Sequence, residues 1–270
     1  MTDLALSLMA PKEQRLQDAG ARAMHILARF APFRRHTMAL DRPMVSFTFD
    51  DVPVSACTRG ADALEAAGGR GTYYVATGLM GIQTAHWTLA GPDEIRDLAR
   101  RGHDIGLHTH DHRPVSALSA RDFSEDLAQN RKILREIVPD LVDESFAFPY
   151  GINDVRRKFQ ASRQVRSCRT IRPGVNHGIL DLDGVLSVEL TDRMIDIKEV
   201  QNYLDEAVAR CGWVVFFTHD VADRPSPWGT SPALFEAAIQ AAKTRDMAIV
   251  SVAQALDHVG APRLSKNKAK

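Results

Sequence analysis

MVSFTFDD, at residues 44–51, is an apolar run of strand-forming residues that ends in two adjacent carboxylates. Apolar side chains fall on both parities of this run, which is typical of a parallel strand covered on both faces. A second run, WVVFFTH at residues 213–219, ends in a histidine. The two runs predict a parallel sheet with polar residues at the carboxyl ends of its strands.

Short runs of the same kind alternate with amphipathic stretches along the chain. The helix signals are Pro92 with two acidic residues after it, Ser119 with Asp122, and the Ser231-Pro232 pair. Repeated β-α units of this spacing predict a parallel α/β sheet, either closed as a barrel or open. The predicted strands are 44–50, 71–76, 103–108, 145–149, 185–190, 213–219 and 247–252, with a weaker one at 164–171; the predicted helices are 92–102, 119–138 and 231–245.

The organisation predicted from these patterns is one α/β domain with two short flanking segments. Residues 1–40 form an N-terminal helical extension, with a basic helix from Lys12 to Phe30. Residues 41–260 form the α/β domain, a length within the range of single domains. Residues 261–270 form a flexible basic tail with three lysines.

Composition and charge exclude several classes of protein. The 34 Lys and Arg balance 34 Asp and Glu, which argues against a dedicated binder of nucleic acid or of anionic membranes. Three widely spaced cysteines without a CxxC motif argue against a disulfide framework. The apolar stretch near the N-terminus is too short for a signal peptide, and no run reaches the length of a membrane span. We therefore expect a cytoplasmic protein without a transmembrane segment; its oligomeric state is open.

Three polar clusters follow predicted strands, where parallel α/β folds build their sites. Asp50-Asp51 could hold a cation with one carboxylate and keep the other as a base, or one Asp could cap a helix. His108-Thr109-His110-Asp111-His112 offers an HxxxH pair for a divalent metal, or is a solvated loop; we expect His110 to project elsewhere. His219 alone would be a core histidine, but the other two clusters could complete a site with it.

Two imidazoles and one carboxylate around a metal leave positions open for water and substrate, as in catalytic sites. A metal held this way activates water, while a free carboxylate and a separate histidine act as base and acid. The three clusters therefore predict a metal-assisted hydrolase of an amide or ester.

These residues resemble the motifs of the polysaccharide deacetylase family, the NodB-homology group of carbohydrate esterase family 4. TFDD at 48–51, HTHDH at 108–112, FPYG at 148–151 and FFTHD around His219 occur in the order and spacing of that family. The resemblance implies a distorted (β/α)7-8 barrel, a divalent metal, most often zinc, and removal of N-acetyl groups from a saccharide with release of acetate. Cobalt, nickel, manganese and O-acetyl substrates also fall within this expectation.

The resemblance also implies residue roles by position. Asp50 is the base, His219 the acid, and the backbone N–H of Tyr150 an oxyanion donor. Metal ligands are Asp51, His108 and His112. Substrate contacts are expected from Pro149, Tyr150 and Trp228, whereas Trp87 is expected to serve in packing.

Three departures from the family pattern concern the surroundings of the metal site. Ala147 stands where the family usually has an arginine paired with the catalytic Asp, so either Arg169 or Arg172 supplies that charge or the base is tuned differently. Glu189 or Asp192 is expected to orient His219. Val52 replaces the glycine that usually follows the two aspartates.

Two other functions stay open from the sequence. Related barrels hydrolyse other non-peptide C–N bonds, in cyclic ureides or imides, with altered metal sites. A non-catalytic saccharide-binding derivative of the barrel would bind metal or sugar without turnover.

Overall fold

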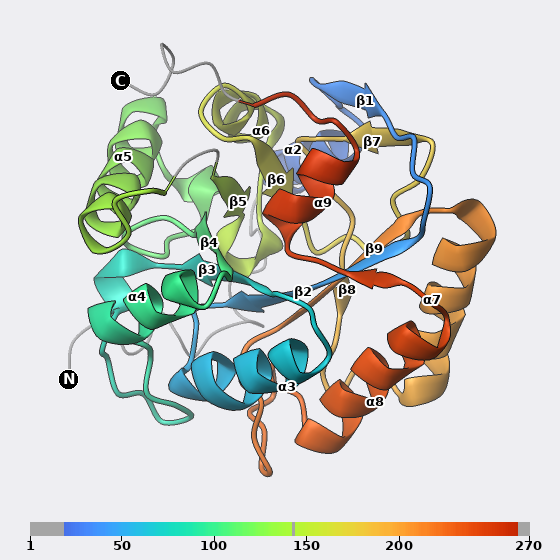
Figure 1. Ribbon diagram of the computed structural model, residues 1–270. Coiled ribbons are helices and arrows are strands. Elements are labelled where there is room, and N and C mark those ends of the chain that lie inside the picture. The colour runs from blue at the N-terminus through green and yellow to red at the C-terminus, as the bar shows by residue number, and fades with distance from the viewer. Residues whose placement is uncertain (1–18, 142–143, 264–270) are drawn as a thin grey trace.

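The computed structural model describes residues 19–141 and 144–263, and its centre is a largely parallel sheet (Figure 1). Strand order along the sheet is β6-β5-β4-β3-β2-β9-β8, and β10 pairs with the start of β2. The strands are β2 (Met44–Asp50), β3 (Thr72–Val75), β4 (Asp104–Leu107), β5 (Ser145–Ala147), β6 (Ser167–Arg169), β8 (Val188–Glu189), β9 (Trp213–Thr218) and β10 (Ala248–Ile249).

The sheet curls into an incomplete barrel, which confirms the predicted fold class. Its two outer strands approach each other through the segment that leads into β8. Cys168 of β6 donates its N–H to Leu182 O at 2.7 Å, and Val185 donates to Cys168 O at 2.9 Å. Leu182 and Val185 lie outside regular strands, so these bonds connect the two edges of the sheet without forming a continuous ladder. All carboxyl ends of the parallel strands therefore surround one opening.

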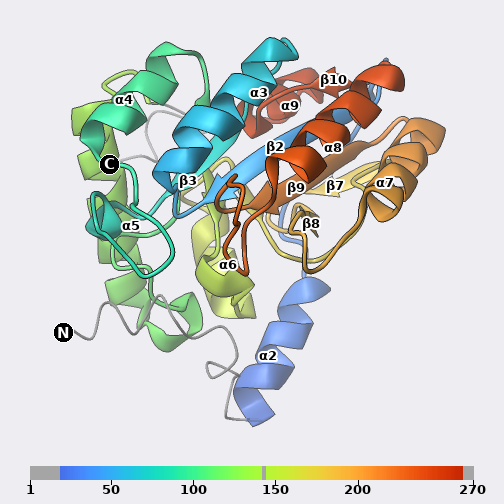
Figure 2. The same ribbon diagram turned by 90° about the horizontal axis from the view of Figure 1, so that it is seen from below.

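Helices cover the outside of the curled sheet (Figures 1 and 2). Aromatic rings fill the space beneath α8, where Phe235 packs edge-on against Phe47 at 5.3 Å between ring centroids. None of the described helices is both long and apolar enough to cross a membrane. The helices are α2 (Ala19–Arg29), α3 (Ala61–Ala66), α4 (Pro92–Arg100), α5 (Ala120–Ile137), α6 (Val155–Ser162), α7 (Ile197–Arg210), α8 (Pro232–Thr244) and α9 (Val252–His258).

Several predicted boundaries were wrong at the ends of short elements. The strand predicted at 247–252 is reduced to β10, because Ser251 caps α9 and its hydroxyl accepts the N–H of Gln254. The strand predicted at 185–190 is only β8. The sequence analysis also missed a small antiparallel pair, β1 (Arg35–Thr37) with β7 (Ile179–Asp181).

The predicted N-terminal helix is observed as α2, which packs against α6. Residues 12–18 of that prediction, and residues 264–270 of the predicted tail, lie outside the described residues. Within the described chain, Lys158 of α6 donates from Nζ to the Ala28 carbonyl at 3.0 Å. A cation at the last turn of α2 complements the helix dipole there.

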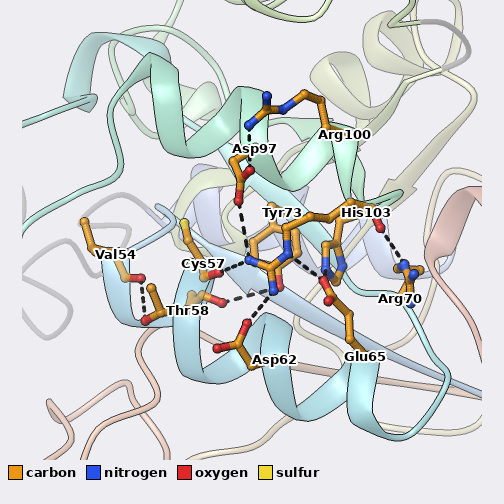
Figure 3. A network of polar contacts seen from close by, with 12 residues as sticks. Val54, Cys57, Thr58, Asp62, Glu65, Arg70, Tyr73, Asp97, Arg100 and His103 are labelled. Atoms are coloured by element: carbon orange, nitrogen blue, oxygen red, sulfur yellow. Dashed lines mark hydrogen bonds and ion pairs between the residues drawn. The ribbon is translucent and has the colours of Figure 1, made fainter.

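The opposite, amino-terminal edge of the sheet carries a dense polar network between α3 and α4 (Figure 3). Arg101 donates from Nε to Glu65 Oε1 at 2.7 Å and from Nη2 to Asp62 Oδ1 at 2.5 Å. His103, buried just before β4, shares Glu65 Oε1 at 2.8 Å from its Nε2. This network ties two helices to the strand starts and lies away from the carboxyl-terminal opening.

Candidate metal and catalytic site

The predicted catalytic and metal-binding residues lie at the carboxyl ends of strands or in the turns that follow them. Asp50 is the last residue of β2, His108 follows β4 and His219 follows β9. Tyr150 lies in the tight turn that follows β5, with φ of 58°. The topology thus brings four distant segments to the opening of the barrel, as the sequence predicted.

Left-handed backbone conformations turn the side chains toward this opening. Asp51 and Val52 have consecutive φ values of 58° and 56°, and in HTHDH both Thr109 and His112 are also left-handed. A positive φ is unfavourable for a β-branched residue such as Val52, so the surrounding packing must hold it there. The turn after Asp50 lets two adjacent carboxylates reach the same cavity rather than opposite faces of the strand.

Asp51, His108 and His112 form a buried cluster whose potential ligand atoms all lie within 4.8 Å of one another. Asp51 Oδ1 lies 3.1 Å from His112 Nε2 and 3.7 Å from His108 Nε2. Among the described residues, no donor forms a hydrogen bond with this buried oxygen. A buried carboxylate oxygen without a donor is energetically costly. The cluster therefore lacks a partner that a bound cation would provide.

The hydrogen bond of His108 shows which of its ring nitrogens faces the cluster. Its Nδ1 donates to the Ala147 carbonyl at 2.8 Å, which leaves the Nε2 lone pair directed toward Asp51. Burial lowers the pKa of His108 to about 4 and that of His112 to about 3, so both rings are neutral at neutral pH. Neutral imidazole with a carboxylate is a donor set typical of zinc, cobalt or nickel.

The residues present therefore fit a divalent cation, and Asp51, His108 and His112 would hold it. Burial raises the pKa of Asp51, and a bound cation would act in the opposite direction by favouring the carboxylate. The carbonyl of Ala147 orients one imidazole in the way that outer partners commonly orient metal-binding histidines.

The second carboxylate, Asp50, is paired with a buried arginine. Arg169 Nη2 lies 2.6 Å from Asp50 Oδ1 and 2.5 Å from Oδ2. Burial alone would raise the pKa of Asp50, but Arg169, with His108 and His219, holds it below its usual value. Of the two arginines that the sequence offered, the geometry selects Arg169 as the partner of Asp50.

Strand register explains why Arg169 can serve here. Arg169 of β6 is the direct parallel neighbour of Ala147 of β5, the position at which the family pattern has its arginine. Paired positions in adjacent strands project to the same face of a sheet. The guanidinium lies over the rings of Tyr74 and Phe217, 5.2 and 4.8 Å from their centroids. The arginine of this protein therefore lies on the strand next to the one expected, at the same height along the barrel axis.

His219 is oriented by a backbone carbonyl. Its Nδ1 lies 3.3 Å from Trp228 O, which also accepts the His219 backbone N–H at 3.2 Å. The ring stacks on Trp87 with centroids 5.6 Å apart and planes 12° apart. Nε2 then faces the cluster, 3.9 Å from Asp51 Oδ2. A carbonyl accepts but never donates, so this bond places the Nδ1 proton and directs Nε2 to the cavity.

The prediction that Glu189 or Asp192 orients His219 was wrong, since each of these described residues bonds to another group. Glu189 accepts the Thr191 hydroxyl at 3.2 Å, and Asp192 accepts the Ser231 N–H at 2.9 Å. The carbonyl of Trp228 occupies the place expected for a carboxylate. Asp220 fixes that loop instead, since it is buried and accepts both the N–H and the hydroxyl of Ser226.

The cluster opens into a cavity of about 180 Å³, whose wall combines the ionisable residues of the site with aromatic and aliphatic side chains. Of the three residues expected to contact substrate, Tyr150 and Trp228 line the cavity, while Pro149 is buried and lies outside this wall. Trp87, expected in packing, both joins a small apolar cluster and lines the cavity. His110 projects elsewhere as predicted, with Nδ1 2.9 Å from the Thr77 hydroxyl.

The sequence analysis missed Ile152, Ile171 and Phe217 as cavity residues. Phe217 is part of an apolar strand, and nothing in its sequence distinguishes it from neighbouring core residues. The positions of the two isoleucines after strand ends were the only available signal.

Comparison with known proteins agrees with this geometry. Residues 37–165 match the family model described as polysaccharide deacetylase. The match contains the TFDD, HTHDH and FPYG motifs, and with them all three residues of the Asp51, His108 and His112 cluster. This part of the chain resembles the polysaccharide deacetylase family. No curated protein matches its sequence.

Solved structures share the fold of this chain at low sequence identity. A family 4 acetyl xylan esterase from Clostridium thermocellum, in complex with a cobalt ion, superposes with a TM-score of 0.58 at 19% identity, covering 81% of this chain and 93% of that chain. A peptidoglycan N-acetylglucosamine deacetylase gives 0.58 at 13% identity, with 85% and 94% covered. A mutant of a family 4 pseudoenzyme gives 0.55 at 13% identity, with 84% and 71% covered.

Proposed function

We propose that this protein is a metal-dependent hydrolase that removes N-acetyl groups from a saccharide or glycoconjugate and releases acetate. The proposal is carried by the buried oxygen of Asp51, which has no hydrogen-bond donor among the described residues and faces two neutral imidazoles. The match of residues 37–165 to the polysaccharide deacetylase model supports the class of reaction. The same site would accept an O-acetyl ester, because the acyl carbonyl is common to both substrates.

A divalent cation, with zinc as our first choice and cobalt, nickel or manganese as alternatives, would supply Lewis-acid polarisation and acidify water. Asp50 accepts the proton of the attacking water. Arg169 lowers its pKa, so the carboxylate is ionised and ready to act as a base at neutral pH. His219 acts as the acid in its doubly protonated form: its Nε2–H is transferred to the leaving nitrogen, while Nδ1–H stays bound to the Trp228 carbonyl and the ring becomes neutral.

The remaining cavity residues position the substrate in this proposal. The backbone N–H of Tyr150 donates to the acyl oxygen as negative charge develops on it. The half-buried ring of Trp228 offers an apolar face to a sugar, and Pro149 shapes the turn that presents Tyr150. Trp87 supports the acid by stacking on His219.

The test is acetate release by the zinc- or cobalt-loaded protein from chitooligosaccharides, N-acetylglucosamine conjugates and acetylated xylan. Asp50→Asn should keep one bound metal per chain and lower turnover by about 10²- to 10⁴-fold, since it removes a base and no ligand. Asp223→Asn, an exposed carboxamide substitution, is the matched control and should retain turnover.

Two results would contradict parts of the proposal. Loss of metal in Asp50→Asn would exchange the roles of the two carboxylates. A full complement of metal with no acetate released from any substrate would favour the binding-only function or another C–N bond, and cyclic ureides and imides would be assayed next.

A further inference from the structure

Helix α2 carries an apolar face that points away from the protein body. Ala28 is buried and His25 contacts the Asn153 carbonyl, so these residues form the inner side of the helix. Ile26, Leu27 and Phe30 lie on the outer side, with 52, 55 and 77% of their surface exposed. Figure 2 shows α2 projecting from the rest of the molecule. This arrangement is the reverse of an ordinary surface helix, whose apolar side faces the core.

The exposed apolar surface continues onto the neighbouring segments. Phe33 follows α2 and packs edge-on against Phe159 of α6 with ring centroids 5.1 Å apart. Both rings remain well exposed. We call the five residues Ile26, Leu27, Phe30, Phe33 and Phe159 the α2–α6 surface. A group of exposed apolar side chains of this size marks an interaction site more often than a solvated face.

Basic residues surround this surface although the whole chain is neutral. Residues 19–37 contain four arginines and no acidic residue, and of these Arg34 is paired with Asp183. Residues 154–166 contain five basic residues and one acidic residue, but Lys158 and Arg166 are buried and paired with carboxylates, so they add no charge to the surface. Arg35, Arg156 and Arg163 are exposed, and Arg163 lies 5.8 Å from the ring centroid of Phe159. Apolar side chains interleaved with arginine complement the headgroups and upper acyl chains of an anionic lipid layer.

We propose that the α2–α6 surface docks this protein on an anionic membrane surface. Leu27 and Phe30 enter the interface between headgroups and acyl chains, while Arg35, Arg156 and Arg163 contact lipid phosphates. This docking is a property beyond the proposed hydrolase activity and does not depend on it.

Docking in this orientation would bring the site opening close to the lipid surface. Gly151 and Ile171 line both the catalytic cavity and a smaller cavity beside it. His25 and Ala28 of α2 form the other side of that smaller cavity. A saccharide held at the headgroup level would therefore have a short path to the site.

The test is co-sedimentation of the full chain with vesicles of phosphatidylcholine alone and of phosphatidylcholine with phosphatidylglycerol. Binding should occur only to the anionic vesicles and weaken as salt is raised. Leu27→Ser with Phe30→Ser should reduce partitioning at least tenfold, because it removes the inserted apolar area. Arg156→Glu with Arg163→Glu should reduce it by a further fivefold or more for each charge removed.

The matched control is Met194→Ser with Val208→Ser, which removes two exposed apolar side chains from another part of the molecule. This variant should bind vesicles as the unmodified protein does. All four positions in the two serine variants are exposed, so their melting temperatures should match that of the unmodified chain.

Three outcomes would overturn the proposal. The first is that the unmodified chain fails to bind anionic vesicles, or that the Leu27 and Phe30 variant binds equally well. The second is a dimer in lipid-free solution that this variant dissociates, which would make a second copy the occupant. The third is a lower melting temperature in this variant alone, which would indicate that residues 1–18 cover the face.

Discussion

Strand β4 has a buried histidine at each end, and the two are satisfied in different ways. His103, before the strand, accepts the Gly71 N–H at Nδ1 and reaches Glu65 from Nε2, at 3.0 and 2.8 Å. His108, after the strand, donates from Nδ1 to a carbonyl, and its Nε2 faces Asp51 Oδ1 at 3.7 Å without a hydrogen bond. One ring has both nitrogens paired by protein atoms, and the other keeps one lone pair for something else.

This difference separates a structural histidine from a ligand better than burial does. Both side chains are almost completely buried, and burial lowers the pKa of both. At the amino-terminal edge, charged partners from α3 and α4 satisfy the polar atoms (Figure 3). At the carboxyl-terminal edge, unsatisfied atoms converge on one point, which stability alone would not favour.

Replacement of His108, the proposed ligand, gives the largest expected effect, and replacement of His103 is the comparison. His108→Ala should weaken the binding of zinc or cobalt by at least about 100-fold, because a direct ligand contributes no less than its outer partners do. His103→Gln should leave metal affinity within about threefold. Titration calorimetry with cobalt measures both.

His110→Ala is the matched control within the His-rich loop. It removes an imidazole two residues from His108 that contacts Thr77 rather than Asp51. Equal losses of affinity in the His108 and His110 variants would mean that the loop, and not the individual ring, determines binding. The distinction between the two ends of β4 would then fail.

A second comparison concerns the two arginines that could serve the base Asp50, Arg169 and Arg172. Arg169→Ala should lower turnover by about 100-fold with metal retained, because the pKa of Asp50 rises when its cation is removed. Arg172→Ala, which removes the other arginine of the same segment, should stay within about threefold. Steady-state acetate release from the folded, metal-loaded variants provides the measurement.

Strand register makes a rescue experiment possible. Ala147→Arg added to Arg169→Ala should recover at least tenfold of the lost turnover, because residues 147 and 169 are register partners on one face. Absence of any recovery, in a variant that folds and binds metal, would show that the position of the guanidinium over Tyr74 and Phe217 is indispensable.

The sequence predicted the fold class because the alternation of strands and helices is a local pattern. It failed where an apolar run continued into another element. Residues 247–252 look like one strand, yet Ser251 and Gln254 form a capping box that starts α9 within the run. The short pair of β1 and β7 has no alternation to detect and depends on contacts between segments far apart in the chain.

The residues of the candidate site that could be predicted are those whose side chains are themselves reactive or metal-binding and follow a predicted strand. Asp51, His108 and His112 carry their chemistry in their residue types. The choice between Arg169 and Arg172 required the register of β5 with β6, which no local pattern contains. The partner of His219 was missed because it is the carbonyl of Trp228, a group that every residue possesses.

The hydrogen bonds of His103 predict a smaller effect, on stability. His103→Gln should lower the free energy of unfolding by about 1–3 kcal/mol at pH 7.5, since the buried Gly71 N–H loses its acceptor. Burial lowers the pKa of His103, so below about pH 6.5 the unfolded chain takes up a proton that the folded chain resists. The difference between the two proteins should therefore shrink as pH falls from 6.5 to 5, by less than about 1.4 kcal/mol per pH unit.

Denaturant unfolding of the metal-free proteins across this pH range measures the difference. His110→Gln provides a control with an imidazole that is less buried. A difference that stayed constant with pH would show that His103 carries its proton equally in both states. The polar network at the amino-terminal edge would then contribute through Arg101 alone.

Asp220 should produce the smallest effect, because it acts on the acid only through a loop. It lies at the catalytic edge, yet its carboxylate is paired like the groups of the opposite edge, with Ser226 N–H at 3.0 Å and Ser226 Oγ at 2.6 Å. Asp220→Asn replaces one accepting oxygen with a donor, which should displace the Trp228 carbonyl from His219. We expect kcat to fall about tenfold while KM and metal affinity change less than about twofold.

Asp223→Asn, in the same loop but exposed, is the matched control and should leave kcat unchanged. If Asp220→Asn lowered metal affinity instead of kcat, the loop would support the Asp51 cluster rather than the acid. The separation of kcat from metal binding is therefore the decisive feature. A loss of kcat alone would show that Asp220, whose oxygens are all paired, positions the catalytic acid. Unpaired buried polar atoms would then identify the metal ligands, but not every residue on which catalysis depends.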